Sequence, residues 1–267
     1  MIHVVVHGAA GRMGRSVIDV LLDQADAGLG AAIEHVGHAA LGQDASLLAG
    51  RGAGQVKVSS DLAGALAAAD VVIDFSTVRA CRELLAACLA QGRAAVIGTT
   101  GLDAACQEAI VSLAQRAPVV VAPNYSVGVN VLLALARQAV ALVGDEFDLE
   151  IVEMHHKRKV DAPSGTAAQL LETVAAARGL SAEGDAVHGR RGETGARGAR
   201  EIGVHALRGG DVVGDHTLVL AGPGERLELT HRAQTRQIFA RGAVLAALWA
   251  AQKPPGLYGM ADVLGIR

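Results

Sequence analysis

The sequence predicts an α/β protein in two parts: a Rossmann-like, doubly wound parallel sheet, and an α+β domain whose sheet is mainly antiparallel or mixed. In the first half, short β-branched runs alternate with alanine- and leucine-rich stretches of helical period, as is typical of strands that pair in parallel. A glycine-rich turn directly follows the first run. In the second half, closely spaced strand-like runs with glycine turns between them favour antiparallel pairing.

The first element is an apolar strand that leads into glycines. Residues 2–6 run into the segment GAAGRMG at 8–14, and apolar residues then recur with helical period. Such glycines allow a tight turn, the close approach of a pyrophosphate and close packing of helix on strand, although the spacing GxxGxxG departs from the commoner GxGxxG. Glu34 lies twenty residues beyond Gly14, in a strand-like run over 30–36, where an acid would bind an adenine ribose. This order predicts a dinucleotide site.

Three further strand-like runs, over 70–75, 94–98 and 118–122, each end in a turn of small or polar residues. Ligands of doubly wound sheets bind outside the carboxyl ends of the strands. The turns are therefore candidates to line the nicotinamide and ribose of a cofactor, at 75–77, 98–101 and 122–125. Helix capping is the competing explanation for Ser76, Thr77 and Thr99.

A basic loop is the most informative feature of the second half. Its sequence over 153–166 is EMHHKRKVDAPSGT, with a strand-like run before it and helical spacing after it. At the helix start, free backbone N–H groups and the helix dipole favour a carboxylate or phosphate. The adjacent histidines offer proton donors, and the cations offer charge-assisted hydrogen bonds. We predict an anion site with proton transfer; a solvated basic turn capped by Ser164 is the alternative.

The rest of the second half contains a helix over 129–143, a polar stretch over 181–200, and strand-like runs over 202–207, 216–221 and 226–231. The runs are expected to join the strand over 149–154, in a sheet whose free edge or face suits subunit association. The polar stretch is interpreted as a disordered connector or as a lid that carries cations over an anionic ligand. A final helix is expected over 236–251.

Composition excludes several classes of protein. The 267 residues carry a net charge of −3 and only 2% aromatic residues, which disfavours nucleic acid as a partner. No apolar run is expected to cross a bilayer and no signal pattern is present, so the protein is expected in the cytoplasm, away from membranes. Cys81, Cys88 and Cys106 lack CxxC spacing and are expected to be buried thiols, and the ligand types suggest no metal site.

Several segments together closely resemble the dihydrodipicolinate reductase family, now called 4-hydroxy-tetrahydrodipicolinate reductases. These are the glycine turn 8–14, GTTG at 98–101, APNYSVGVN at 122–130 and the basic loop 153–166. The resemblance runs from end to end, since it includes 224–233 and the tail 257–264, and the His-His-Lys segment is highly specific to the family.

This resemblance implies a reductase of a cyclic dicarboxylate in lysine and diaminopimelate biosynthesis, with NADH or NADPH as cofactor. It also implies a homotetramer built on the second sheet. Residues 1–126, completed by 236–267, would form the dinucleotide-binding domain, and 127–235 would bind substrate and form the oligomer. By the same resemblance, His155 would donate or accept a proton, Lys159 would donate one, and the substrate would bind to His156, Gly165 and Thr166.

The cofactor residues implied by the resemblance are Glu34 and three groups: the glycine turn (Gly8, Ala9, Ala10, Gly11, Arg12, Met13), the 98–100 turn (Gly98, Thr99, Thr100) and the 122–125 turn (Ala122, Pro123, Asn124, Tyr125). Two positions depart from some relatives. His35 follows Glu34 where certain members carry arginine, so a strong preference for NADPH is not expected. Tyr125 stands where phenylalanine is common.

Two alternatives remain at this stage. One is another NAD(P)-dependent dehydrogenase of an amino-acid intermediate; the lack of a cysteine near a strand-end motif disfavours a thiol-acyl mechanism. The other is a nucleotide-sensing module without turnover, because fold does not fix function. A sensor would need neither His155 nor Lys159.

Overall fold

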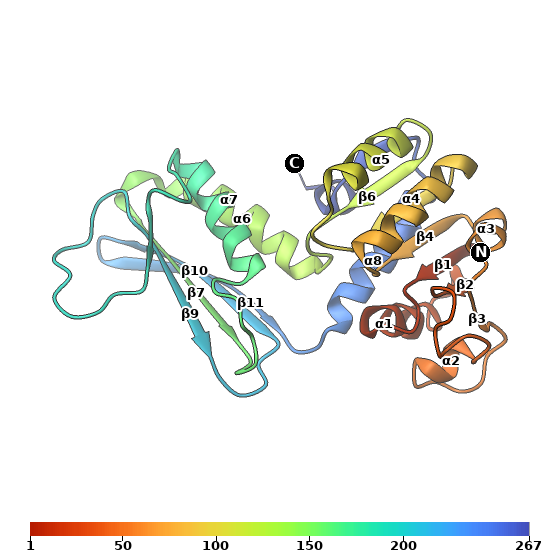
Figure 1. The fold of residues 1–267 in the computed structure, drawn as a ribbon. Helices are drawn as coiled ribbons and strands as arrows, with labels where there is room; N and C mark the ends of the chain where they lie inside the picture. Colours follow the sequence, from red (N-terminus) through yellow and green to blue (C-terminus); the bar gives the residue numbers. More distant parts are fainter. Residues whose placement is uncertain (267) are drawn as a thin grey trace. The chain divides into compact units, whose positions relative to one another are not determined.

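The structure is a computed structural model that describes residues 1–266, and it divides into two compact units (Figure 1). Unit 1 comprises residues 1–127 together with the segment from Gln237 onward, and unit 2 comprises residues 128–236. Unit 1 therefore contains both ends of the chain, and unit 2 is inserted between its strand β6 and its helix α8.

Unit 1 is a doubly wound sheet whose seven strands are all parallel, in the order β12-β6-β5-β4-β1-β2-β3. Its strands are β1 (Ile2–His7), β2 (Ala27–Ile33), β3 (Val58–Ser59), β4 (Val71–Asp74), β5 (Ala94–Ile97), β6 (Pro118–Val121) and β12 (Gly256–Tyr258). Its helices are α1 (Arg12–Leu21), α2 (Ala45–Leu48), α3 (Leu62–Ala67), α4 (Val78–Gln91), α5 (Ala104–Ala114), α8 (Gln237–Ala250) and α9 (Met260–Leu264).

Helices cover both faces of this sheet. Successive β1 side chains alternate between two cores: Val4 and Val6 pack with α1 and α8, while Val5 packs with α4 and α5. Parallel strands buried on both faces read as continuous apolar runs, which is why the sequence indicated them. The Rossmann-like fold class is confirmed, and the C-terminal helix α8 completes one face of the sheet.

Unit 2 places two long helices on one face of a five-stranded mixed sheet of order β11-β10-β7-β9-β8 (Figure 1). Its elements are α6 (Val127–Val143), the 3₁₀ turn Gly144–Glu146, β7 (Asp148–His155), α7 (Gly165–Arg178), β8 (Ala186–His188), β9 (Ile202–Arg208), β10 (Gly214–Gly222) and β11 (Glu225–Ala233). β10 pairs antiparallel with β7 and β11, whereas β9 pairs parallel with β7 and β8. Leu149 and Ile151 of β7 pack under α6 and α7.

The helix α6 corrects one expectation. With the following 3₁₀ turn it forms a segment of 20 residues with mean hydropathy 1.7, long and apolar enough by length and composition to cross a bilayer. The expectation that no run reaches this length is therefore wrong. One side of the helix packs into the core of unit 2 through Val129, Leu132, Ala136 and Val140. A core helix of a soluble protein satisfies the same criterion.

Candidate functional site

The turn after β1 has the close glycine packing and the uncapped helix start that are typical of phosphate-binding turns. Gly8 has φ +75°, and a Cβ there would lie 2.6 Å from the carbonyl oxygen of Phe75, so only glycine fits. Gly14 packs directly on the backbone of Gly8 and Ala9. The N-cap of α1 is Gly11, whose position provides no side-chain cap. The first amides of α1, those of Arg12 and Met13, therefore remain available to an anion.

A pocket of about 770 Å³ lies beside this turn within unit 1. Gly8, Gly11 and Glu34 line it, together with residues of the loop after β4 and the first turn of α4. Glu34 lies just beyond the end of β2, and its Oε1 accepts a hydrogen bond from the backbone N–H of Ala10, 2.8 Å away. That bond holds the carboxylate against the glycine turn. A pocket that joins this acid to the turn fits the adenosine end of a dinucleotide.

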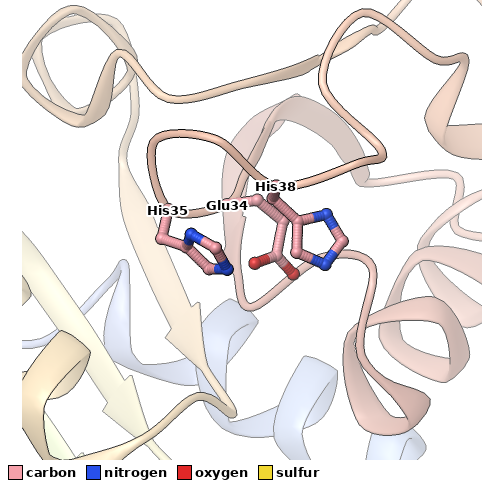
Figure 2. Close-up of side chains that lie close together, drawn as sticks. All are labelled: Glu34, His35 and His38. Atoms are coloured by element: carbon pink, nitrogen blue, oxygen red, sulfur yellow. The ribbon is translucent and has the colours of Figure 1, made fainter.

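Two histidines flank the Glu34 carboxylate (Figure 2). The ring centroids of His35 and His38 are 5.1 Å apart, with the planes nearly perpendicular. One ligand atom from each of Glu34, His35 and His38 lies within 4.8 Å of the others. The sequence suggested no such metal-ligand group. The Nδ1 of His38 already accepts a hydrogen bond from the N–H of Ala40 at 3.1 Å, so that nitrogen is engaged within the loop.

A buried polar network, which no local sequence pattern indicates, connects the carboxyl ends of three strands. Asp74, at the end of β4, is fully buried and accepts three hydrogen bonds. They come from His7 Nδ1 of β1 at 2.7 Å, Ser76 Oγ at 2.6 Å and Thr99 Oγ1 at 2.7 Å. The backbone N–H of Ser76 in turn donates to Thr99 Oγ1 at 2.9 Å. The network fixes the 75–77 and 98–100 turns relative to the end of β1.

The same network tests helix capping as the explanation for Ser76, Thr77 and Thr99. Thr77 does cap α4, since its Oγ1 accepts from the N–H of Ala80 at 3.3 Å. Ser76 and Thr99 instead bond to Asp74. Capping therefore explains one of the three side chains. In the 98–101 turn, Gly98 packs against the Phe75 ring, and Thr100 is exposed at the strand ends.

The 122–125 turn is held from inside the core. The hydroxyl of Tyr125 bonds to the carbonyl oxygens of Ile97 at 2.8 Å and Val120 at 3.0 Å, which identifies its partners. Burial raises the pKa of Tyr125. Its side chain is thus structural, and the backbone is what it offers to a ligand. Asn124 Oδ1 accepts from the N–H of Ser126 at 2.9 Å, Ala122 is buried, and Pro123 is exposed.

In unit 2 the basic loop joins the end of β7 to the start of α7. Ser164 is the N-cap of α7, and its Oγ accepts from the N–H of Ala167 at 3.1 Å. Capping by Ser164 is therefore correct, and it coexists with an exposed first residue, Gly165. Thr166 follows on the same turn. Nδ1 of His156 is buried without a hydrogen-bonding partner among the described residues, which is costly unless a ligand supplies one.

Lys159 is held within the loop. Its Nζ donates to Asp161 Oδ2 at 2.9 Å, and its backbone N–H bonds to His156 O at 3.0 Å. The hydrogen bond from Lys159 lowers the pKa of Asp161. The Lys159 side chain is 19% exposed, so the ammonium group is largely removed from water while remaining close to His156 in the loop. Lys157 and Arg158 are exposed.

His155 ends β7 and is held by a buried carboxylate. Its Nδ1 donates to Glu153 Oε2 at 2.6 Å. Arg208, at the end of β9, makes two further hydrogen bonds to Glu153, at 2.9 and 3.0 Å, and the N–H of Ser164 donates to Oε1 at 3.1 Å. Burial alone would raise the pKa of Glu153, but the bonds from Arg208 and His155 outweigh it and lower that pKa.

His216 of β10 completes this cluster, and sequence reasoning missed it together with Glu153 and Arg208. Its Nε2 lies 3.1 Å from Ser164 Oγ, and its ring is 5.2 Å from that of His155. Burial, with repulsion from His155, lowers the pKa of His216 to about 4. Because Ser164 Oγ already accepts from Ala167, its hydroxyl proton is free to donate to the neutral His216 ring. The useful signal was the strand register, which pairs His216 with Glu153.

The polar stretch over 181–200 has an ordered structure, and two of its arginines are held in ion pairs. It contains β8, which pairs with β9. Arg190 forms ion pairs with Glu150 and Glu201, and Arg197 with Asp148 and Glu150. These arginines hold the stretch against the sheet. The lid interpretation stays a prediction, and Arg190 and Arg197 are not free to provide its cations, because both are already paired.

The three cysteines are buried and free, as expected. All lie in the core under α4 and α5. Burial raises the pKa of Cys81, Cys88 and Cys106, to about 12 for Cys88. A buried thiol of raised pKa is a poor nucleophile, which weighs against thiol-acyl chemistry.

The doubly wound parallel sheet, the glycine turn and the pocket beside it are typical of dinucleotide-dependent oxidoreductases. Residues 2–125 match the family "Dihydrodipicolinate reductase, N-terminus", and residues 128–264 match "Dihydrodipicolinate reductase, C-terminus". The chain belongs to the dihydrodipicolinate reductase family.

Individual relatives agree. The chain is 50% identical over 266 residues to the 4-hydroxy-tetrahydrodipicolinate reductase of Magnetococcus marinus, covering 100% of this chain and 99% of that protein. It is 53% identical over 267 residues to the reductase of the same name from Anaeromyxobacter sp. (strain Fw109-5), with coverage of 100% and 99%. Among solved structures, a dipicolinate-bound dihydrodipicolinate reductase from Paenisporosarcina sp. TG-14 aligns with TM-score 0.77 and 25% identity over 98% of each chain.

Proposed function

We propose that this chain reduces 4-hydroxy-tetrahydrodipicolinate to tetrahydrodipicolinate, with loss of water, in lysine and diaminopimelate biosynthesis. The cofactor is NADH or NADPH. The observation that carries the proposal is the full-length match to the reductases, in a chain whose second unit links His155 through Glu153 to the N-cap of α7. Both ligand classes, a dinucleotide and a dicarboxylate, have chemically suitable sites.

Unit 1 is assigned the cofactor. When bound, NAD(P)H supplies the hydride, and the protein contributes position and electrostatics. Residues 8–13 would receive the pyrophosphate on the amides of the turn and of α1, and Glu34 would bind the adenine ribose. The turns 98–100 and 122–125 would line the nicotinamide side, with Thr99 fixed by Asp74 and Tyr125 by its core hydrogen bonds.

We assign the substrate to unit 2, as the family resemblance implies for residues 127–235. A substrate carboxylate would bind at the start of α7 on Gly165 and Thr166, with His156 as a further donor. Hydride delivery to an unsaturated ring develops negative charge that an acid must neutralise. His155 would donate or accept that proton at Nε2, the ring nitrogen that does not bind Glu153, and Lys159 would donate one.

Steady-state loss of nicotinamide absorbance, with the substrate generated in situ, tests the proposal for NADH and NADPH separately. His155→Ala and Lys159→Ala should each lower turnover by about 10²-fold or more, the usual contribution of a positioned acid or base. Cofactor affinity should be unchanged. His188→Ala, at an exposed histidine of β8, is the control. Wild-type turnover in both catalytic variants would overturn the assignment, and no turnover in wild-type protein that binds cofactor would favour the sensor.

Comparable efficiency with NADH and NADPH is the expected cofactor profile. Glu34 suits the free ribose hydroxyls of NADH, and an imidazole at His35 pairs less well with a 2′-phosphate than an arginine would. His35→Arg should therefore shift the ratio of kcat/KM values towards NADPH. A ratio that stays the same would show that the loop after β2 does not contact the 2′ position.

We further infer a homotetramer in the cytoplasm. The sheet of unit 2 supports association, because the helices α6 and α7 lie on one face only and the edge strand β11 is largely exposed (Figure 1). Light scattering coupled to size-exclusion chromatography would measure the mass. A monomeric mass at assay concentration would rule the tetramer out.

A further inference from the structure

The carboxylate of Glu153 gathers four hydrogen bonds at the end of β7 in unit 2. Oε2 accepts from His155 and from Arg208, and Oε1 accepts from Arg208 and from the N–H of Ser164. The Glu153 side chain has no exposed surface. A buried carboxylate persists only with such complete pairing, because removing it from water is costly. It therefore fixes the groups around it.

The bond to His155 decides which ring nitrogen can exchange a proton. An ionised carboxylate only accepts, so Nδ1 of His155 carries a hydrogen and donates it to Glu153. Proton exchange is then confined to Nε2. The space at Nε2 is kept by a glycine: a Cβ on Gly214 of β10 would lie 2.9 Å from that atom. The His155 residue is 9% exposed, so few other orientations are open to the ring.

The other bonds tie the histidine to the anion site. Ser164 donates its N–H to Glu153 and caps α7 with its hydroxyl. Arg208 also donates to the carbonyl oxygen of Asp161 at 2.7 Å, within the basic loop. One carboxylate thus sets the position of the histidine, the start of α7 and the loop between them.

We propose that Glu153 is the positioning residue for proton transfer: it holds His155 in the Nδ1–H tautomer with Nε2 directed at the substrate. This inference rests on the proposed reductase function. Glu153 adds no chemical step to the proposed reduction, because it exchanges no proton itself. Its negative charge stabilises the imidazolium form of His155 whenever Nε2 is protonated. Arg208 keeps Glu153 ionised.

Glu153→Gln is the sharpest test, because the amide retains the shape and removes one acceptor. An amide N–H facing Nδ1 would favour the opposite tautomer, with the hydrogen on Nε2, and would oppose the imidazolium. We expect kcat to fall by about 10²-fold while KM changes by less than about threefold. In a His155→Gln background, Glu153→Gln should cost less than about threefold more, since the two residues act as one unit.

The control is Glu150→Gln on the same strand. Glu150 also binds one histidine, His205, and arginines, so the chemical change is matched. Turnover should stay within about twofold of wild type. Equal losses in Glu150→Gln and Glu153→Gln, or a Glu153→Gln loss that multiplies fully with His155→Gln, would assign Glu153 a general structural role and overturn the inference.

Nitrogen NMR of ¹⁵N-histidine-labelled wild-type protein reports the tautomer of His155 directly. This measurement does not depend on whether Glu153→Gln folds. The His155 signals are assigned by their loss in His155→Gln. A neutral ring protonated on Nδ1 supports the proposal, and a ring protonated on Nε2 overturns it. Failure of the reductase function itself is a separate outcome: wild-type protein would then show no turnover, whereas the tautomer would still report the Glu153 bond.

Discussion

Glu150 and Glu153 lie three residues apart on β7, and each binds one histidine together with arginine. Their settings differ. Glu153 is on the face that α6 and α7 cover, and its side chain is fully buried, whereas Glu150 is on the opposite face with 21% of its side chain exposed. Alternation along a strand sends residues three apart to opposite faces. Similar side chains thus form a buried hydrogen-bonded cluster around His155 on one face, and on the other face they hold the 181–200 stretch against the sheet.

The two histidines also use different nitrogens. His155 binds Glu153 through Nδ1, and its Nε2 lies beside Gly214, whereas His205 binds Glu150 through Nε2 at 2.7 Å. The arginines differ as well: Arg208 comes from the end of a strand, while Arg190 and Arg197 come from the stretch before β9. A carboxylate beside a histidine is therefore weak evidence for catalysis until the free nitrogen and its surroundings are known.

Of the paired changes at the Glu153 and Glu150 clusters, replacing one arginine in each should give the largest difference in stability and turnover. Arg208→Met leaves the buried Glu153 carboxylate short of two hydrogen bonds, and breaking a buried ion pair costs about 3–5 kcal/mol. Turnover should also fall by about tenfold or more, because the His155 partner loosens. Arg190→Met removes a partly exposed pair that Arg197 backs up, and should cost about 1 kcal/mol or less, without loss of turnover.

Hydrogen–deuterium exchange of the β7 and β9 amides, together with kcat, measures both effects. The predicted difference would be contradicted if Arg190→Met raised the exchange rates of the β7 and β9 amides as much as Arg208→Met does. In that case the ion pairs of the 181–200 stretch would stabilise the sheet as strongly as the buried cluster.

Gly214 lies against the Glu153 cluster and Gly203 against the Glu150 cluster, which allows a second matched pair of substitutions. On Gly214 a Cβ would press on the His155 ring at 2.9 Å, and that ring is fixed by Glu153. On Gly203 of β9 a Cβ would strike the carboxylate end of Glu150, a flexible group on a partly exposed face. Gly214→Ala should lower kcat about tenfold by displacing Nε2. Gly203→Ala should leave kcat within about twofold and cost about 1–2 kcal/mol of stability.

Steady-state kinetics and urea unfolding distinguish these outcomes. Normal turnover in Gly214→Ala would mean that the space beside Nε2 is not where the proton is exchanged. A turnover loss in Gly203→Ala equal to that in Gly214→Ala would mean that distortion of the sheet, and not the position of His155, limits the reaction.

The contrast between the Glu150 and Glu153 clusters also shows which features could be predicted from the sequence and which could not. The glycine turn, Glu34 and the basic loop are local patterns, so their residues could be named before any contact was known. Glu153 stands inside the recognised loop segment, yet its role depends on Arg208, 55 residues away. The alternation of β7 marks Glu150 and Glu153 equally as charged residues in a strand. Only the register and the helices over one face separate them.

Unit 1 shows the same limit. The strands and their turns follow from continuous apolar runs, and their existence was predicted. The role of Asp74 was not, because its partners His7 and Thr99 lie 67 and 25 residues away in the sequence. Helix capping was the local explanation for Thr99, and a long-range hydrogen bond replaced it. The helix α6 shows the opposite error, since its composition meets a criterion that the expectation had ruled out.

Acid pH should lower the stability over a different pH range on each of the two faces. On the covered face, burial lowers the pKa of His216 from 6.5 to about 4. The unfolded chain then binds the proton more readily than the folded one, so stability is full above pH 6.5 and is lost as the pH falls through 4. On the open face, burial would raise the pKa of Glu150, but hydrogen bonds from Arg190 and His205 bring it from 4.5 to about 2. Its contribution is present above pH 4.5 and is lost as the pH falls towards 2.

Urea unfolding from pH 7 to pH 3, followed by circular dichroism, should resolve these ranges through two variants. His216→Gln should flatten the loss between pH 6.5 and 4, which amounts to at most about 3 kcal/mol for a shift of this size. Glu150→Gln should leave that range intact and reduce the loss below pH 4.5, where the lowered pKa of Glu153 still contributes. If His216→Gln changed only the lower range, the neutral state assigned to His216 would be wrong, and with it the acceptor role of its Nε2 towards Ser164.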